Sequence, residues 1–427
     1  MYHVQDLGSF GGDLVGLAIN RSGDIAGYAF MPDGTYHAIR WTRAGGLEDL
    51  GSNGGFTAQG VSINDNGDVG GVYVTITGNF VRVSGFIAHR GGSFESLFTP
   101  ARPIVRVNTI TNDGRLAGMI EPDFTQPNAF RTLADGTVES FGNPDMGSAA
   151  SKMNAAGDLS GYEVRNLPGD EQQAFRYTTA AGRVDLGTLG GVASVGSSIN
   201  SDGVVVGWAT DVNELEQAFR ARPGFPMERL DGWVEGSFGN ANDINDAGVI
   251  VGAMGGTAFV YLPGSGVVQL ESRVPSAERQ QFLVEGMAVN ESGQVVALYR
   301  DGSRYGTVLL TPFVDNGAPA ITSASVSPHV LRPADGTMRD VTLDVTATDE
   351  IDPAPVCRIV GVTNSQWRSQ NADPSVHITG NLTVSLRASR RGPGDERLYT
   401  ITVLCEDASG NGTDTKLFVR VPRPFHW

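Results

Sequence analysis

The side chains of this chain that could do chemistry are carboxylates, arginines and aromatics, and they form no recognised catalytic motif. No His-Glu-x-x-His, Gly-x-Ser-x-Gly or phosphate-binding loop is present, and the six histidines are not spaced as metal ligands. Paired carboxylates remain, and two of them could cleave a glycosidic bond if the fold brought them together in one central pocket. The spacing singles out no such pair.

We expect function on the connecting segments whose lengths vary most, because a rigid scaffold fixes their bases while their tips differ. Those segments carry residues that could bind a sugar or a cation: Asp123, Phe124, Asp170, Glu171, Asp211, Glu214, Trp233 and Arg279. The competing interpretation is that these are solvated loop residues.

The elements that must position these residues come from a unit that recurs seven times at steps of about 45 residues. The unit is an apolar residue, Asn, two variable residues and Gly, then a second Gly four residues on, as in Ile19-Asn20-Arg21-Ser22-Gly23 closing on Gly27. Short β-type runs without a 3.6-residue apolar period indicate the four-stranded blades of a propeller. We therefore predict an all-β fold with a seven-bladed β-propeller over residues 1–313.

The repeated positions carry structural expectations. The apolar residue before the Asn should line the core near the central axis, at Ile19, Ile63, Ile110, Met153, Ile199, Ile244 and Val289. The second glycine should let a neighbouring blade approach closely. An Ala-Phe-Arg triplet recurs at 129–131, 174–176 and 218–220. Its Phe should fill the gap between blades, and its Arg should pair with carboxylates such as Asp6, Asp49 and Asp185.

The two ends of the repeat region are complementary. The seventh repeat lacks a fourth strand, whereas the segment 3–8 matches the fourth-strand segment 47–51. We predict that the N-terminal strand completes the last blade, which closes the ring and removes exposed sheet edges.

These motifs resemble those of the bacterial extracellular HAF-repeat proteins, whose units carry a Leu-Gly-x-x-Gly-Gly turn, an Ile-Asn-x-x-Gly turn and a His-Ala-Phe triplet. Residues 185–191 and 199–203 are similar to the two turns, and the resemblance covers about 1 to 312. Only His37 keeps the histidine of the triplet. The resemblance implies a secreted bacterial protein and no particular activity.

A second domain is predicted over 314–427, because the repeat stops near residue 315 and alternating strands typical of an Ig-like β-sandwich follow. Its turns resemble those of Ig-like, cadherin-related and hyalin-repeat modules, some of which bind calcium. Asp349, Asp352 and Asp407 are the corresponding calcium candidates, and the competing interpretation makes them turn formers. Cys357 and Cys405, both in apparent strands, suggest a disulfide and an oxidising compartment, against two buried thiols.

Charge and hydropathy restrict the function. The net charge of −16 disfavours nucleic acid, and no apolar run reaches the roughly 20 residues of a spanning helix. No signal peptide is evident, so we expect a secreted or cell-surface protein whose signal has been removed, or a chain without one. The leading hypothesis is a non-enzymatic protein that binds an extracellular protein or glycan, and the balance is against enzymatic activity. The alternatives are a carbohydrate-active lyase or hydrolase and a self-assembling subunit of an extracellular array.

Overall fold

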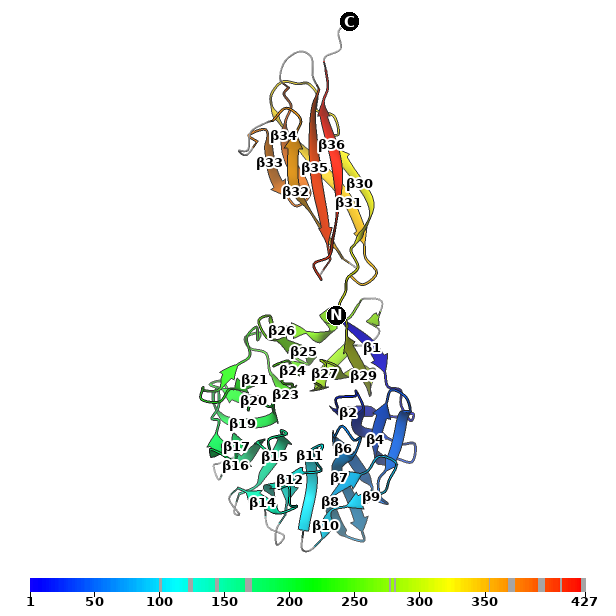
Figure 1. The fold of residues 1–427 in the computed structure, drawn as a ribbon, viewed down its shortest axis with the longest axis vertical. Coiled ribbons are helices and arrows are strands. Elements are labelled where there is room, and N and C mark those ends of the chain that lie inside the picture. Colours follow the sequence, from blue (N-terminus) through cyan, green and yellow to red (C-terminus); the bar gives the residue numbers. More distant parts are fainter. Residues whose placement is uncertain are drawn as a thin grey trace. The chain divides into compact units, whose positions relative to one another are not determined.

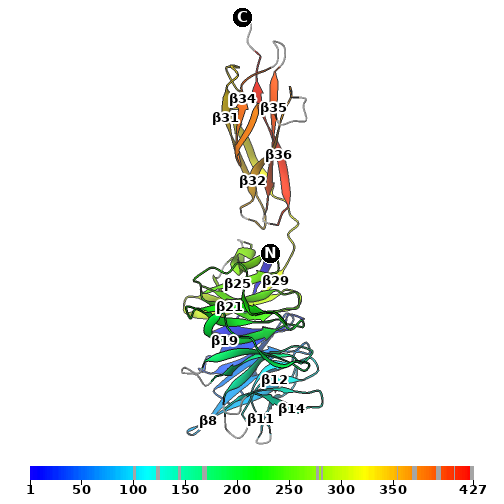
Figure 2. The ribbon, with the colours of Figure 1, turned by 90° about the vertical axis from the view of Figure 1, so that its left-hand side faces the viewer.

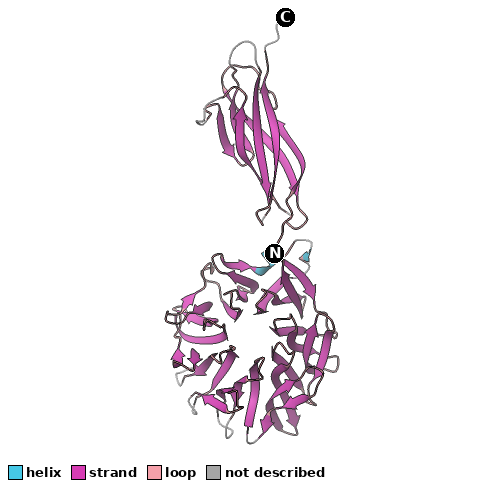
Figure 3. Cartoon of the chain, viewed as in Figure 1, coloured by secondary structure: helices cyan, strands magenta, loops and turns pink. Residues whose placement is uncertain are grey.

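The structure is a computed structural model of the 427-residue chain, and it describes residues 1–99, 102–121, 126–142, 146–165, 171–275, 278–279, 282–352, 354–367, 373–390, 396–407 and 409–423. Nearly all regular structure is strand (Figure 3). The chain separates into two compact units: Tyr2–Val274 with Glu278–Pro312, and a second one built mainly on Phe313–Trp427.

The first unit is propeller-like, with antiparallel repeat sheets arranged around a common axis (Figure 1). The first repeat contributes β2 (Leu14–Ile19), β3 (Ile25–Phe30), β4 (Tyr36–Thr42) and β5 (Gly46–Gly51), and the second contributes β6 (Thr57–Ile63), β7 (Val69–Thr77), β8 (Phe80–Ala88) and β9 (Phe94–Ser96). One parallel pairing, of Tyr36 on β4 with Thr57 on β6, joins these two repeat sheets into a single eight-stranded sheet. The third contains β10 (Phe98–Thr99), β11 (Arg102–Ile110), β12 (Leu116–Ile120), β13 (Asn128–Thr132) and β14 (Val138–Phe141). The fourth contains β15 (Ser148–Met153), β16 (Leu159–Val164), β17 (Gln172–Thr178) and β18 (Gly182–Asp185).

The fifth repeat sheet contains β19 (Gly190–Ile199), β20 (Val205–Asp211), β21 (Glu216–Ala221) and β22 (Glu228–Arg229), and the sixth contains β23 (Gly239–Ile244), β24 (Ile250–Met254), β25 (Thr257–Leu262) and β26 (Gly266–Gln269). A 3₁₀ turn, η2 (Leu270–Arg273), follows. The last repeat sheet combines β27 (Phe282–Val289), β28 (Val295–Asp301) and β29 (Arg304–Pro312) with β1 (Tyr2–Asp6).

The pairing of β1 with β29 joins the two ends of the repeat region. The strands are antiparallel, with Tyr2 opposite Pro312 and Asp6 opposite Val308. The N-terminal segment therefore supplies the strand that the last repeat lacks, as its sequence predicts.

Every repeat sheet has a β-bulge in its first strand, two residues before the apolar residue of the repeat unit. In the first sheet Gly16 pairs with Gly27, and the bulge follows at Leu17. A Cβ on Gly27 would overlap the carbonyl oxygen of Val15 in the same sheet. The expectation of a close approach by the neighbouring blade is therefore wrong, because the obstacle is the sheet's own first strand, bent by the bulge.

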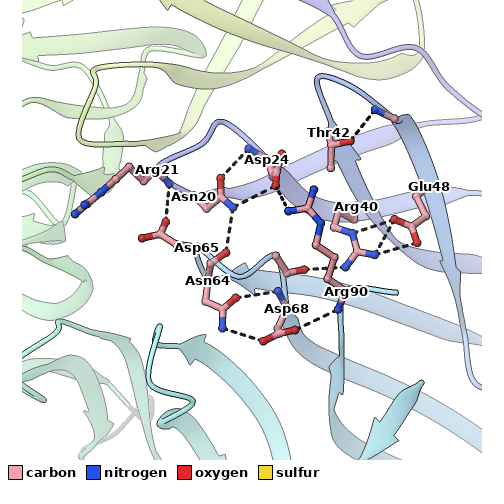
Figure 4. Close-up of polar contacts among 12 residues, drawn as sticks. Asn20, Arg21, Asp24, Arg40, Thr42, Glu48, Asn64, Asp65, Asp68 and Arg90 are labelled. Carbon is pink, nitrogen blue, oxygen red and sulfur yellow. Dashed lines mark hydrogen bonds and ion pairs between the residues drawn. The ribbon is translucent and has the colours of Figure 1, made fainter. Parts of the chain in front are cut away.

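In the Ala-Phe-Arg triplets and their variants, the Phe fills the space between sheets as predicted, but the Arg has a different carboxylate partner from the one expected. The phenylalanines are buried, and Phe175, for example, packs against Ala117 and Ala129 of the preceding sheet. Arg40 does not pair with Asp49 but with Glu48, which lies directly opposite it on β5, and it also donates to the carbonyl of Gly67 in the next repeat at 2.7 Å. Figure 4 shows Arg40 and Glu48 side by side.

The second unit contains two antiparallel sheets, whose strands can be followed in Figure 2. One sheet has the order β30 (Ala320–Ser327), β31 (Met338–Thr348), β34 (Thr383–Arg387), β33 (Val376–Gly380), and the other has the order β32 (Val356–Asn364), β35 (Arg397–Glu406), β36 (Gly412–Val421). A core around Tyr399 and Ile401 lies within this unit. The predicted disulfide between Cys357 and Cys405 is present, and it joins directly opposed residues of β32 and β35.

Candidate functional site

The first strands of the repeat sheets end around one polar cavity of about 520 Å³, the axial pocket. Five of the residues that precede the apolar position line it, and they differ from repeat to repeat: Ala18, Ser62, Thr109, Lys152 and Asp243. The lining also includes Glu291, two positions after the apolar Val289. The bulge beside each of these positions re-aims the local backbone, as bulges do near many functional sites. The pocket opens among the Asn-x-x-Gly turns, on the face opposite the variable segments.

Asparagine side chains fix the wall of this pocket. Asn20 donates from Nδ2 to the carbonyl of Asn64 in the next repeat at 3.0 Å, and its Oδ1 accepts the amide N–H of Asp24 at 2.8 Å (Figure 4). The same bonds recur around the axis, and Asn290 donates to the carbonyl of Asn20 at 3.0 Å. The side chains of the turns therefore bond the last repeat to the first.

The third repeat departs from this pattern because Thr111 stands at the Asn position. Its hydroxyl donates to Asp113 at 2.5 Å and lies 3.1 Å from the carbonyl oxygen of Arg115, both in its own turn. The bond to the next repeat is made instead by Arg115, whose guanidinium donates to the carbonyl of Ala155 at 2.7 Å.

Asp243 is the buried carboxylate of the axial pocket, with a relative exposure of 5%. Its Oδ1 accepts a hydrogen bond from the Ser198 hydroxyl at 2.7 Å and lies 3.3 Å from Nζ of Lys152. Its Oδ2 accepts the amide N–H of Val289 at 3.1 Å. One cation and two hydrogen-bond donors thus hold the Asp243 carboxylate in place.

Glu291 is the second carboxylate, at the mouth of the same pocket. Its oxygens accept the amide N–H of Asp246 at 3.1 and 3.3 Å. Partial desolvation raises the pKa of Glu291, and the charges of Asp246 and Asp243 raise it further, while the Asp246 N–H and the charge of Arg21 oppose the shift. The axial pocket thus holds two carboxylates in different surroundings, one paired with a lysine and the other with a raised pKa.

The binding-face residues predicted from the sequence do not form a common site among the described residues. Asp123, Phe124 and Asp170 lie outside the part of the chain that the structure describes. Asp211 accepts the amide N–H groups of Asn213 and Leu215 and bonds Gln217, so it shapes its own turn. Glu214 is exposed in that turn with a φ of 58°, and Glu171 is half-buried beside Arg165.

Two further predicted residues have structural surroundings. Trp233 is buried, packs edge-on against Phe259 and donates from its indole to the carbonyl of Ser237. Arg279 is exposed and donates to the carbonyls of Val274 and Ser272.

The sequence does contain a signal for the axial pocket. Asp243 and Lys152 are charged residues at a repeat position that elsewhere holds Ala, Ser or Thr. A charge that interrupts a series of small residues beside a core position marks a place where burial must be compensated by a partner.

In the second unit, the oxygens of Asp315, Asp349 and Asp407 lie within 4.8 Å of one another. The group contains two of the three calcium candidates, with Asp315 in place of Asp352. Burial opposes ionisation of Asp407, but hydrogen bonds from Asn411, Ser409 and Gly410 lower its pKa. Calcium binding stays a prediction.

No protein-family model matches this chain, and no curated protein matches it in sequence. Among solved structures, a mutant of puromycin hydrolase complexed with PGG is 14% identical with a TM-score of 0.45, and the match covers 77% of this chain and 61% of that one. AofleA from Arthrobotrys oligospora is 9% identical with a TM-score of 0.35, over 71% and 87%. Dipeptidyl peptidase 4 from Porphyromonas gingivalis is 10% identical with a TM-score of 0.36, over 94% and 58%. The chain thus spans less than two thirds of the length of the first and the last of these.

Two of these structures are named as a hydrolase and a peptidase. The leading prediction of a non-enzymatic binding protein, with its balance against enzymatic activity, is corrected accordingly. The physical reason for the error is that residues far apart in sequence, such as Asp243 and Lys152, meet only when the repeat sheets surround the axis. Among the described residues there is no helix with the length and hydropathy of a membrane span.

Proposed function

We propose that this protein is a glycan hydrolase whose active centre is the axial pocket. The observation that carries the proposal is the pair Asp243 and Glu291 in a single cavity: Asp243 is buried and pairs with Lys152, and Glu291 has a raised pKa. Two carboxylates in different surroundings in one pocket are the arrangement that glycoside hydrolysis uses.

In this mechanism Glu291 is the proton donor. It would protonate the departing oxygen as the glycosidic C–O bond breaks, and the Asp243 carboxylate would stabilise the positive charge that develops on the sugar carbon. Water then supplies the hydroxyl group to that carbon and returns a proton to Glu291. Lys152 and Ser198 contact Asp243 and fix its position.

A glycan fits the lining of the pocket better than a peptide or an ester does. Hydroxyl and amide groups surround the carboxylates, among them Ser62, Thr109 and Asn112, and they can exchange hydrogen bonds with sugar hydroxyls. The described lining contains no histidine or cysteine that could form a nucleophile–base pair of the acyl-transfer type.

We further propose that residues 1–313 form a seven-bladed propeller related to the HAF-repeat proteins. The bond from Asn290 to Asn20 and the pairing of β1 with β29 support closure of the ring after the seventh repeat. The Asn-x-x-Gly turns and the Ala-Phe-Arg strands support the relationship.

For residues 314–427 we propose an Ig-like sandwich. The strand orders β30-β31-β34-β33 and β32-β35-β36 correspond to the two sheets of a seven-strand immunoglobulin-type domain. The Tyr399 hydroxyl donates to the carbonyl of Arg387 at 2.8 Å and so ties β35 to the end of β34 in the other sheet. The disulfide supports secretion, since such bonds persist in oxidising compartments.

The test is hydrolysis of a panel of neutral and acidic oligosaccharides, with products identified by mass spectrometry. The wild type should release shorter sugars, and Asp243→Asn and Glu291→Gln should each lower turnover by about 10² to 10⁴-fold while the protein stays folded. Glu235→Gln, at an exposed site outside the pocket, is the matched control and should leave turnover unchanged. Equal turnover in all four proteins would refute the assignment.

A further inference from the structure

The rim of the axial pocket follows a hydrogen-bonding rule. The side chain that follows the Asn of one repeat accepts the amide N–H of the equivalent residue in the preceding repeat. Asp65 accepts from Arg21 at 2.9 Å, and Asp246 accepts from Ser201 at 2.8 Å. Glu291 in turn accepts from Asp246. At the seam between the last repeat and the first, the next residue in this ring is Arg21, which has donors only.

The guanidinium of Arg21 has no hydrogen bond or ion pair to any described residue. In Figure 4 the Arg21 side chain extends away from Asp65, whose carboxylate accepts the backbone N–H of Arg21. The other cations of the lining are engaged: Lys152 pairs with Asp243, and Arg115 pairs with Asp113 at 2.8 Å and donates to the carbonyl of Ala155. Arg21 is therefore the cation of the described lining that is left for a ligand.

Resting on the proposed function, we infer that the substrate carries an anionic group, a carboxylate or a sulfate on a sugar, and that Arg21 binds this group beside Glu291. A guanidinium offers paired N–H donors that match the oxygens of either anion. The net charge of −16 opposes the approach of a dense polyanion. It therefore favours a sugar that carries a single anionic group.

Binding at Arg21 is coupled to the acid of the proposed reaction. The Arg21 charge favours the ionised form of Glu291, which works against its role as proton donor. An anion on the guanidinium cancels that influence, so Glu291 takes up a proton when an acidic sugar binds. A neutral sugar leaves the protonation of Glu291 unchanged.

The experiment compares matched sugar pairs by calorimetry: galacturonate with galactose, glucuronate with glucose, and glucose 6-sulfate with glucose. Wild-type protein should bind at least one acidic member about tenfold or more tightly than its neutral partner. Arg21→Gln should abolish that preference, Arg21→Lys should restore part of it, and Arg43→Gln, at an exposed arginine outside the pocket, should leave it intact. Titration in buffers of different ionisation enthalpy should show proton uptake with the acidic sugar, which Glu291→Gln removes.

The outcomes separate the two proposals. Equal affinity for every acidic and neutral pair, or a preference that Arg21→Gln leaves intact, would overturn the inference, whether or not neutral glycans are hydrolysed. An acidic preference that depends on Arg21 without any hydrolysis would support the site and count against the enzymatic proposal. A preference for the carboxylate or for the sulfate sugar identifies the anion.

Discussion

Replacing one asparagine of the axial ring should destabilise the whole repeat unit. Asn245 is buried, donates from Nδ2 to the carbonyl of Asn290 at 3.0 Å and accepts the amide N–H of Val249 at 2.9 Å. Asn245→Ala leaves the Val249 N–H without this acceptor, which costs about 1–3 kcal/mol. The Asn290 carbonyl still accepts the amide N–H of Gly293, so losing the bond from Asn245 costs only about 1 kcal/mol. We expect a decrease of about 2–4 kcal/mol in the free energy of unfolding.

Urea unfolding followed by tryptophan fluorescence and far-UV circular dichroism measures this decrease. The midpoint should fall with an unchanged m-value, because the surface exposed on unfolding stays the same. Asn213→Ala, in an exposed turn, is the control and should stay within about 0.5 kcal/mol of the wild type. A loss for Asn245→Ala no larger than that of the control would refute the reasoning that the ring of asparagines holds the repeats together.

Three further outcomes are expected. The pKa of Glu291 is raised in the folded state, so its ionisation destabilises the fold as the pH rises above about 4.3, the ordinary pKa of a glutamate. Glu291→Gln should therefore have a higher melting temperature than the wild type at pH 7 and the same melting temperature at pH 3. Thermal scans at both pH values check this. Reducing the disulfide between Cys357 and Cys405, or replacing both with serine, should lower the stability of the second unit by roughly 4 kcal/mol, measured on its own unfolding transition; no change would show that the closed loop contributes nothing. If calcium binds the group containing Asp349, millimolar CaCl₂ should raise the same transition in the wild type and not in Asp349→Asn, and an equal response in both would remove the metal prediction.

The sequence predicts the repeat sheets well, because each sheet is built from local hairpins with their own turn chemistry. The Asn-x-x-Gly turns occur where the unit predicts them, with Asn20 accepting the amide N–H of Asp24 and Gly23 at a φ of 84°. The pairing of β1 with β29 could also be predicted, since the last repeat lacks one strand and the N-terminal segment matches it. Similar arguments do not give the partner of Arg40, because Glu48 and Asp49 are neighbours in sequence and only strand register decides between them.

The candidate site could not be predicted in the same way. Length variation favours the loop face, whereas Asp243 and Glu291 line one pocket at the opposite end of the axis, among turns of constant length. Asp243 and Lys152 are 91 positions apart in the chain, and nothing local joins them. Their ion pair exists only because the fourth and sixth repeat sheets face the same pocket. Only the substitution of charged residues for small ones at a repeated position hints at the pocket.

The leaving-group dependence of Glu291→Gln tests the central claim most directly. On a natural oligosaccharide, whose departing hydroxyl needs a proton, the variant should lose about 10² to 10⁴-fold in kcat. On the dinitrophenyl glycoside of the same sugar, whose departing phenolate needs none, it should keep nearly the full wild-type rate. Equal losses on the two substrates, or no loss on either, would contradict the assignment of the axial carboxylates as the hydrolytic pair.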